Sequence, residues 1–302
     1  MARVLGWILV RLPRRLLAVV FGALGVLVWT LGLRRRVVAE NLRLAFPEKS
    51  ERERRTIARA TYRHLGEMIP EFLRVPYLPR EEVARLFEYE GWENYEKARA
   101  EGKGVIACTG HFGHFDLLAA AHNLRGVPIT TISRKMVVGL WKGTRARAGV
   151  QEIYVKQGET FAAAVKALRA GRVLGYVIDQ SERRRTAIFP TFFGVPAATS
   201  PTPAVLSRRT GAPVVFAVSV PLPDGRHRVI IEGPFRPPDT GDHERDAVAF
   251  LQDMNDRLER YIRRHPEQWY WLHRRWKRRG PARAQANRAM GWGPRAKRGG
   301  GA

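Results

Sequence analysis

Gly104-Val-Ile-Ala-Cys-Thr-Gly-His-Phe-Gly-His-Phe-Asp116 is the stretch that decides the fold of this chain. Its first part, Val105–Thr109, is a short apolar run bounded by glycines, a pattern that predicts a buried β-strand. A helical pattern begins at Asp116. In an open α/β sheet, ligands bind beyond the carboxyl ends of the strands, so residues 110–116 are predicted to form a site.

The remainder of the chain alternates between short apolar runs and helical patterns. This alternation predicts an α/β fold with a mixed, mostly parallel central sheet flanked by helices. Near the N-terminus, Ser50 is followed three residues later by Glu53, which predicts a capping box at the start of a long helix. Further strands are predicted at 128–133, 152–155, 173–178, 214–220 and 228–232, and helices at 116–124, 136–148, 159–169, 202–209 and 242–264.

The N-terminus contains a membrane-anchor candidate. Residues 16–33 carry no charge, and arginines flank them on both sides. As a helix this segment extends about 27 Å, close to the thickness of the hydrocarbon core of a bilayer. A signal peptide is the alternative, but no small-residue cleavage site precedes Arg34–Arg36. We predict an anchor within residues 1–36, with the main domain on the cytoplasmic side, where anionic lipid attracts basic residues.

Composition limits the partners. Lys and Arg number 53 against 28 Asp and Glu, a net charge of +25. Such a charge predicts an anionic partner: nucleic acid, anionic membrane, an acidic protein or a phosphorylated substrate. The single cysteine, Cys108, excludes a disulfide framework and a multi-cysteine zinc site. We predict a folded domain over residues 37–279 and a disordered basic tail over 280–302.

His111 and Asp116 are the residues predicted to carry chemistry. They diverge on a continuous helix, but they converge if His111 lies in the loop and Asp116 in the first helical turn. Asp116 would then orient the imidazole, and neutral His111 would take a proton from a hydroxyl. A buried structural histidine with Asp116 as a helix cap is one alternative. A metal site formed by His111, His114 and Asp116 is another.

This motif, with others in order along the chain, resembles the late acyltransferases of lipid A biosynthesis, within the lysophospholipid acyltransferase superfamily. The superfamily motif is His, four residues, then Asp or Glu. The family's usual form resembles Gly-His-Phe-Gly-Asn-Trp-Glu, from which this chain departs at His114, Phe115 and Asp116. The resemblance covers about residues 5–279, and its other matches lie at 43–48, 179–180, 192–196 with Thr199, 211–213 and 266–276.

The resemblance implies an acyltransferase domain on the cytoplasmic face of the bacterial inner membrane. A fatty acyl thioester, on acyl carrier protein or coenzyme A, is attacked by a hydroxyl of a glycolipid such as a lipid A precursor. His111 acts as the base and Asp116 orients it, with no metal or organic cofactor. No Gly-x-Ser-x-Gly elbow occurs, so attack is expected to be direct. The alternatives are another lipid acceptor, such as a lysophospholipid or mannosylated lipid, or a basic protein that binds membrane or nucleic acid without catalysis. We predict that nucleic acid is not a partner.

Four further residues are predicted to contact substrate. Arg134 follows the strand at 128–133 and would bind a phosphate or polarise the thioester carbonyl. Arg147 with Gly149 resembles part of the family's Arg-x-x-x-Gly region. Asp179 and Gln180 end the strand at 173–178, so they are expected to face the site of His111 and hold arginines or the acceptor.

Three residue groups carry two interpretations each. The basic run 183–185 is a solvated loop or a contact for the acidic carrier or a phosphorylated headgroup. Phe189, Phe192 and Phe193 form an acyl-chain slot or part of the core. The C-terminal tryptophans interleave with basic residues, which suits a membrane interface or stacking on nucleic acid. They are Trp269, Trp271 and Trp276.

Overall fold

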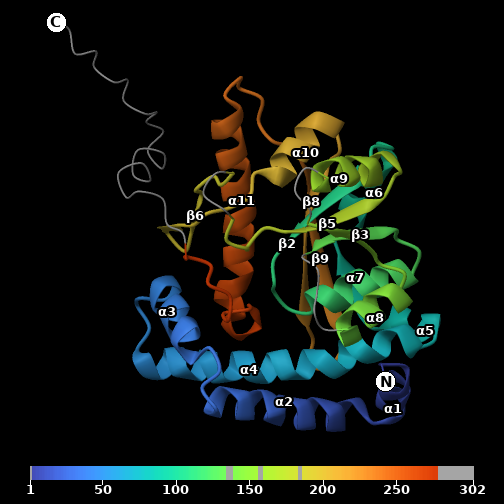
Figure 1. The fold of residues 1–302 in the computed structure, drawn as a ribbon, viewed down its shortest axis with the longest axis vertical. Coiled ribbons are helices and arrows are strands. Elements are labelled where there is room, and N and C mark those ends of the chain that lie inside the picture. The colour runs from blue at the N-terminus through green and yellow to red at the C-terminus, as the bar shows by residue number, and fades with distance from the viewer. Residues whose placement is uncertain (1, 134–138, 156–158, 183–185, 278–302) are drawn as a thin grey trace, which may run out of the picture.

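A seven-stranded sheet forms the centre of the molecule (Figure 1). The computed structural model describes residues 2–133, 139–155, 159–182 and 186–277. Neighbouring strands pair parallel except β8 and β9, which are antiparallel. The predicted mixed, mostly parallel sheet flanked by helices is confirmed. The strand order is β1 (Phe87–Glu90), β9 (His227–Phe235), β8 (Val214–Pro221), β2 (Val105–Thr109), β5 (Val173–Val177), β3 (Ile129–Ser133) and β4 (Gln151–Tyr154).

The helices lie close to their predicted positions. The sequence pattern does not predict β1, the short helix α5, or the hairpin of β6 (Thr191–Phe192) and β7 (Val195–Pro196). The division of the chain at residues 36 and 279 stays a prediction. The helices are α1 (Ala2–Arg11), α2 (Arg14–Thr30), α3 (Arg35–Ala45), α4 (Glu51–Arg74), α5 (Arg80–Arg85), α6 (Trp92–Ala100), α7 (Phe115–Leu124), α8 (Gly139–Arg147), α9 (Thr160–Arg169), α10 (Thr202–Thr210) and α11 (His243–Arg264), with 3-10 turns at η1 (Val75–Tyr77) and η2 (Pro266–Gln268).

The sheet separates two hydrophobic clusters. Successive residues of a strand point to opposite faces, so both faces of these apolar strands are buried. Ile106 and Leu174 belong to a cluster shared with α9, α10 and α11. Their neighbours Val105 and Val173 belong to a second cluster, shared with α6 and α7. The continuous apolar run that predicted β2 therefore reflects burial on both sides.

Helix α2, which contains most of the predicted anchor, lies lengthwise against α4 (Figure 1). A Cβ atom at Gly25 would lie 2.0 Å from the carbonyl oxygen of Tyr62, and one at Gly66 would lie 2.1 Å from that of Phe21. Glycine at these two positions thus allows the helix backbones to touch. No single helix in the described ranges is both long and apolar enough to span a membrane. Helices α2 and α3 meet the length and composition criteria only as a pair, bent by 93°.

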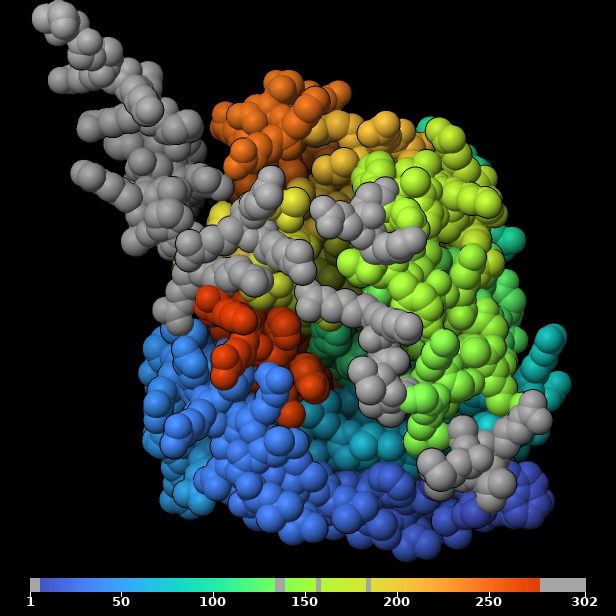
Figure 2. All heavy atoms as spheres, viewed as in Figure 1, coloured from blue at the N-terminus to red at the C-terminus, as the bar shows by residue number. Residues whose placement is uncertain are grey.

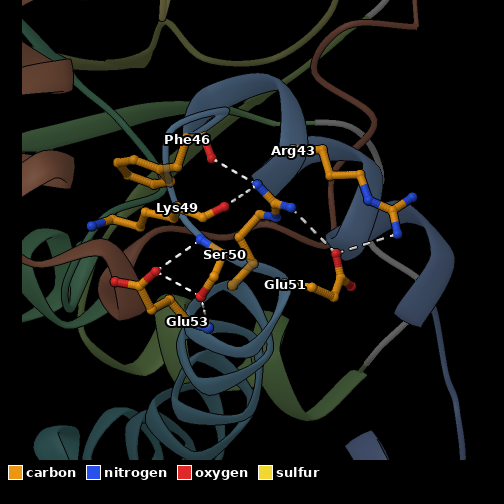
Figure 3. A network of polar contacts seen from close by, with 7 residues as sticks. Arg43, Phe46, Lys49, Ser50, Glu51 and Glu53 are labelled. Atoms are coloured by element: carbon orange, nitrogen blue, oxygen red, sulfur yellow. Dashed lines mark hydrogen bonds and ion pairs between the residues drawn. The ribbon is translucent and has the colours of Figure 1, made fainter.

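The capping box at the start of α4 is confirmed (Figure 3). The Ser50 hydroxyl accepts from the Glu53 backbone N–H at 3.3 Å, and the Glu53 carboxylate accepts from the Ser50 N–H at 2.8 Å. Arg54 donates to the carbonyls of Phe46 and Lys49, which closes the turn between α3 and α4. This turn sets α3 so that Asn41 donates to two carbonyls of the C-terminal segment.

Candidate functional site

The register of two parallel strands brings the candidate catalytic residues together. Thr109 of β2 lies opposite Val177 of β5, so His111 and Asp179, each two residues further on, leave the sheet side by side. The Asp179 carboxylate accepts from the His111 backbone N–H and lies 2.7 Å from His111 Nδ1. Trp269 Nε1 also donates to this carboxylate, at 2.7 Å. Asp179, predicted at this edge, is thus the direct partner of His111.

Electrostatics around this pair determine which proton His111 holds. Burial alone would lower the pKa of His111, but the adjacent Asp179 carboxylate outweighs it and raises that pKa above its ordinary value. Burial would raise the pKa of Asp179, yet His111 and Trp269 hold it well below its usual range. Asp179 is therefore ionised at neutral pH and favours the Nδ1–H tautomer of His111. The Nε2 lone pair then lies away from Asp179 and accepts from the Gln180 amide at 3.3 Å.

Asp116 does not contact His111, which corrects the predicted role of orienter. It does lie in the first turn of α7, but its carboxylate accepts from Trp141 Nε1 at 2.8 Å and from Arg145 Nε at 3.0 Å. Arg145 also pairs with Glu152 at 2.9 Å. Burial would lower the pKa of Arg145, but Asp116 and Glu152 outweigh burial and raise that pKa above its ordinary value. The guanidinium therefore stays charged. Asp116 influences His111 only through space, as a charge that raises its pKa.

The sequence predicts substrate contact for Arg147 and makes no such prediction for Arg145. Residues two apart on a helix point to nearly opposite sides. Arg145 lines the large cavity beside His111, while exposed Arg147 stacks on the Tyr77 ring, 4.4 Å from its centroid. The assignment of Arg147 to the substrate is therefore not supported by its position. Trp141, four residues before Arg145, marks the inward face of α8 and could have identified the correct arginine.

The other predicted substrate residues divide between described and undescribed parts of the chain. Gln180 lines the cavity, and its amide nitrogen lies 3.3 Å from His111 Nε2. Arg134 and the basic run 183–185 lie outside the described residues.

A cavity of about 2300 Å³ opens at this edge of the sheet. Figure 2 shows the molecule hollowed between the red C-terminal segment and the green helices. His111, Asp116, Arg145 and Gln180 line its polar part. The lining then continues along the sheet face that carries α6 and α7, where small side chains leave space. These apolar lining residues include Ala107, Leu118, Ala119, Gly175, Ala217 and Ile231.

The C-terminal segment, residues 266–277, packs against the loop that carries His111, and its tryptophan rings belong to the hydrophobic core. Trp269, Trp271 and Trp276 are at most 4% exposed, so neither a membrane interface nor nucleic-acid stacking fits these rings. The backbone of this segment pairs with the motif loop, residues 110–114 between β2 and α7. Tyr270 N–H donates to His111 O at 2.9 Å, and Gly113 N–H donates to Gln268 O. Phe192 and Phe193 are buried against the same tryptophans, which corrects the acyl-slot interpretation for these two rings.

His114 occupies a different environment from His111. Its Nε2 lies 2.9 Å from Glu71 Oε2, and His227 Nε2 lies 3.0 Å from the same oxygen. Because His111, His114 and Asp116 each have a different partner, they do not form the metal site considered from the sequence. Burial would raise the pKa of Glu71, but His114 and His227 hold it well below its usual value. The Glu71 carboxylate thus ties the motif loop to α4 and β9.

Comparison with known proteins identifies the family of this chain. The family model described as bacterial lipid A biosynthesis acyltransferase matches residues 2–278. The chain belongs to this family. It is similar to the lipid A biosynthesis lauroyltransferase of Escherichia coli K12, with 29% identity over 90% of this chain and 89% of that protein. The palmitoleoyltransferase of the same strain is 28% identical over the same shares, and the myristoyltransferase is 25% identical over 83% and 77%. The protein is an acyltransferase of lipid A biosynthesis.

Proposed function

We propose that the protein transfers a fatty acyl chain from acyl carrier protein or coenzyme A to a hydroxyl of a lipid A precursor, with His111 as the general base. The observation that carries the proposal is the His111–Asp179 pair, which faces a large cavity at the carboxyl edge of the sheet. A base needs a lone pair at the reacting hydroxyl. The Asp179 contact leaves that lone pair on Nε2, where the acceptor hydroxyl takes the place of the Gln180 amide.

The reaction is direct acyl transfer. His111 Nε2 removes the proton from the acceptor hydroxyl, and the oxygen attacks the thioester carbonyl. The new C–O bond forms, the C–S bond breaks, and the imidazolium returns the proton to the leaving sulfur. Arg145, charged and lining the same cavity, provides positive potential for the developing oxyanion. Asp116 is a positioning residue in this scheme, because it holds Arg145.

We assign the acyl chain to the apolar part of the cavity. Gly175 lies there without a positive φ, and a Cβ atom would meet only ordinary contacts, the nearest at 3.6 Å from Thr131 Cγ2. A larger side chain at this position would therefore project into the space for the chain. Gly175→Leu is expected to shift selectivity toward shorter acyl donors, measured by competition between donors of different length. Ala170→Leu, on the outside of the domain after α9, is the matched control.

Membrane association is proposed through the outer face of α1 and α2. Exposed apolar side chains gather there, including Trp7 at 55%, Val19 at 65% and Leu27 at 52%. Because α2 lies against α4, this face is suited to in-plane insertion at the cytoplasmic surface of the bacterial inner membrane, with flanking arginines on anionic headgroups. Retention on anionic vesicles in high salt would support insertion. Full release in salt, or no loss of binding in Val19→Asp/Leu27→Asp, would contradict it.

The deciding experiment measures transfer of labelled acyl chains to a panel of lipids. The panel contains a lipid A precursor, a lysophospholipid and a mannosylated lipid, with wild type, His111→Ala and His243→Ala compared. His243 is exposed at the start of α11 and serves as the control histidine. Transfer to the lipid A precursor that is lost only in His111→Ala is expected. Transfer to another lipid would retain the mechanism and change the acceptor. Undiminished transfer by folded His111→Ala would exclude this base.

A further inference from the structure

A second cavity, of about 280 Å³, is lined by the start of α2, the last turn of α4, α5 and the β8–β9 turn. Within the described residues, its lining shares no residue with the large cavity beside His111. Arginines from four separate elements line it: Arg14 at the start of α2, Arg74 at the end of α4, Arg85 at the end of α5, and Arg226 in the β8–β9 turn. The two acidic residues in the lining are Glu71 and Glu82.

Arg74 is the unusual member of this set. It is only 8% exposed, and its Nε and one terminal nitrogen are buried without a hydrogen-bond partner among the described residues. Burial lowers the pKa of this guanidinium and the nearby charge of Arg14 lowers it further, which together outweigh the opposite effect of Glu71 and Glu82. Buried polar groups in folded proteins nearly always have partners, and a buried unpaired cation is especially costly. The Arg74 guanidinium therefore has buried N–H donors for which the described residues provide no acceptor.

The other charges of the cavity do not supply it. Arg14 is paired with Glu71, whose second oxygen is occupied by His114 and His227. Arg226 is held by Asp224 and Glu88. Arg85 has no ion pair within the described part of the chain, and exposed Glu82 makes none with Arg74. Two guanidinium groups thus remain available to one ligand.

We propose that this cavity binds a phosphate group, with Arg74 as its main contact and Arg85 as a second. The planar guanidinium presents paired N–H donors that match phosphate oxygens, so a phosphate in the cavity supplies the acceptor that Arg74 lacks among the described residues. The volume suits a phosphate or a small phosphate-bearing headgroup. The apolar outer face of α1 and α2 begins beside Arg14, so a phospholipid headgroup is one source of the phosphate and the free ion is the other.

The test is thermal unfolding of the purified full-length protein in neutral detergent, at constant ionic strength. Inorganic phosphate, short-chain phosphatidylglycerol and short-chain phosphatidylcholine are titrated separately into wild type, Arg74→Met and Arg80→Met. Arg80 is exposed on α5 and does not line the cavity, so it is the matched control. We expect the midpoint of wild type and Arg80→Met to rise by roughly 5 °C at saturation.

Arg74→Met is expected to respond differently in two ways. It loses the anion-dependent rise, and it unfolds at a higher temperature than wild type without added anion, because an unpaired buried charge has been removed. A response to phosphate alone identifies the free ion, and a response to phosphatidylglycerol alone identifies the headgroup. Failure of wild type to respond to either, or an equal response in Arg74→Met, overturns the proposal.

A second variant keeps the test decisive if Arg74→Met fails to fold. Arg85 is exposed, so Arg85→Met retains the fold and is expected to weaken anion binding about tenfold. Unchanged affinity in Arg85→Met would then count against the site. The site is independent of the chemistry at His111, so His111→Ala should keep the full anion response even when acyl transfer is lost.

Discussion

His111 and His114 lie three residues apart in one loop, and each contacts a carboxylate, yet their environments are opposite. His111, with Asp179, borders a cavity of about 2300 Å³, and its side chain is 18% exposed. His114, with Glu71 and His227, is sealed inside the protein at 4% exposure. In the proposed mechanism, an imidazole–carboxylate pair can act as a base only where one nitrogen faces space for a substrate. The His114–Glu71 pair, which lacks that space, instead links the loop to α4 and β9.

Removing the charge of each carboxylate gives the largest expected contrast. Asp179→Asn should lower kcat/KM for acyl transfer by about 10²–10⁴-fold, because it disturbs the tautomer and orientation of His111. Glu71→Gln should lower kcat/KM by less than about tenfold, but reduce the free energy of unfolding by roughly 1–3 kcal/mol. Steady-state kinetics and chemical denaturation of both variants measure this. Equal kinetic losses would remove the distinction between the two pairs.

The Asp116–Arg145 contact offers an intermediate effect. Asp116→Asn should leave Arg145 charged but less firmly placed, and we expect transfer to fall about 10- to 100-fold. If Asp116 positions Arg145, then Arg145→Lys should show a similar loss, and the double variant little more than either single one. Arg147→Lys is the control on the opposite side of α8. Additive losses would show that the two residues act separately.

The pH dependence of activity should follow His111. Its pKa is raised by Asp179, and the base must be neutral, so the rate should fall about tenfold per pH unit below that raised pKa. Without Asp179, burial dominates and lowers the pKa. The acid limb of Asp179→Asn should therefore move to lower pH, in whatever activity remains. A limb that stays in place would assign the titration to another group.

The smallest expected effect is on the pH dependence of stability, which should follow buried histidines with a lowered pKa, such as His64. Burial, with a smaller contribution from His114, lowers the pKa of His64 to about 3, so His64 remains neutral in the folded state. The unfolded chain protonates below its ordinary value near 6.5, and stability is lost as pH falls through that value. Each such histidine contributes at most about 1.4 kcal/mol per pH unit.

His64→Gln tests that contribution by denaturation at pH 7 and pH 5. It should lose less stability on acidification than wild type. His111 acts in the opposite sense, because its raised pKa stabilises the folded state at low pH and this contribution fades as pH rises through that pKa. His111→Ala should therefore lose more stability on acidification than wild type. The control His243→Ala should lose as much as wild type does. A larger acid loss in His64→Gln would contradict the assignment.

Much of the fold could be predicted because its signals are local. The apolar run of β2 matches its observed bounds, and the Ser50–Glu53 capping box is a contact over three residues. The Trp269–Trp276 segment shows where local signals stop. Alternating tryptophans and basic residues suggest an interface, but the rings are buried and Arg275 is fully enclosed, donating to Ala198 O and Thr199 Oγ1. Composition alone does not distinguish an exposed amphipathic strip from a packed one.

The sequence by itself determined most of the strand and helix pattern, the loop that carries His111, and membership in a lipid A acyltransferase family. These follow from side-chain periodicity and from residues close together along the chain. The tertiary structure decided that Asp179, 68 residues away, holds His111, while nearby Asp116 holds Arg145. It also decided that Arg74 is buried without an acceptor. Each of these depends on strand register and on packing between distant elements, where spacing along the chain carries no information.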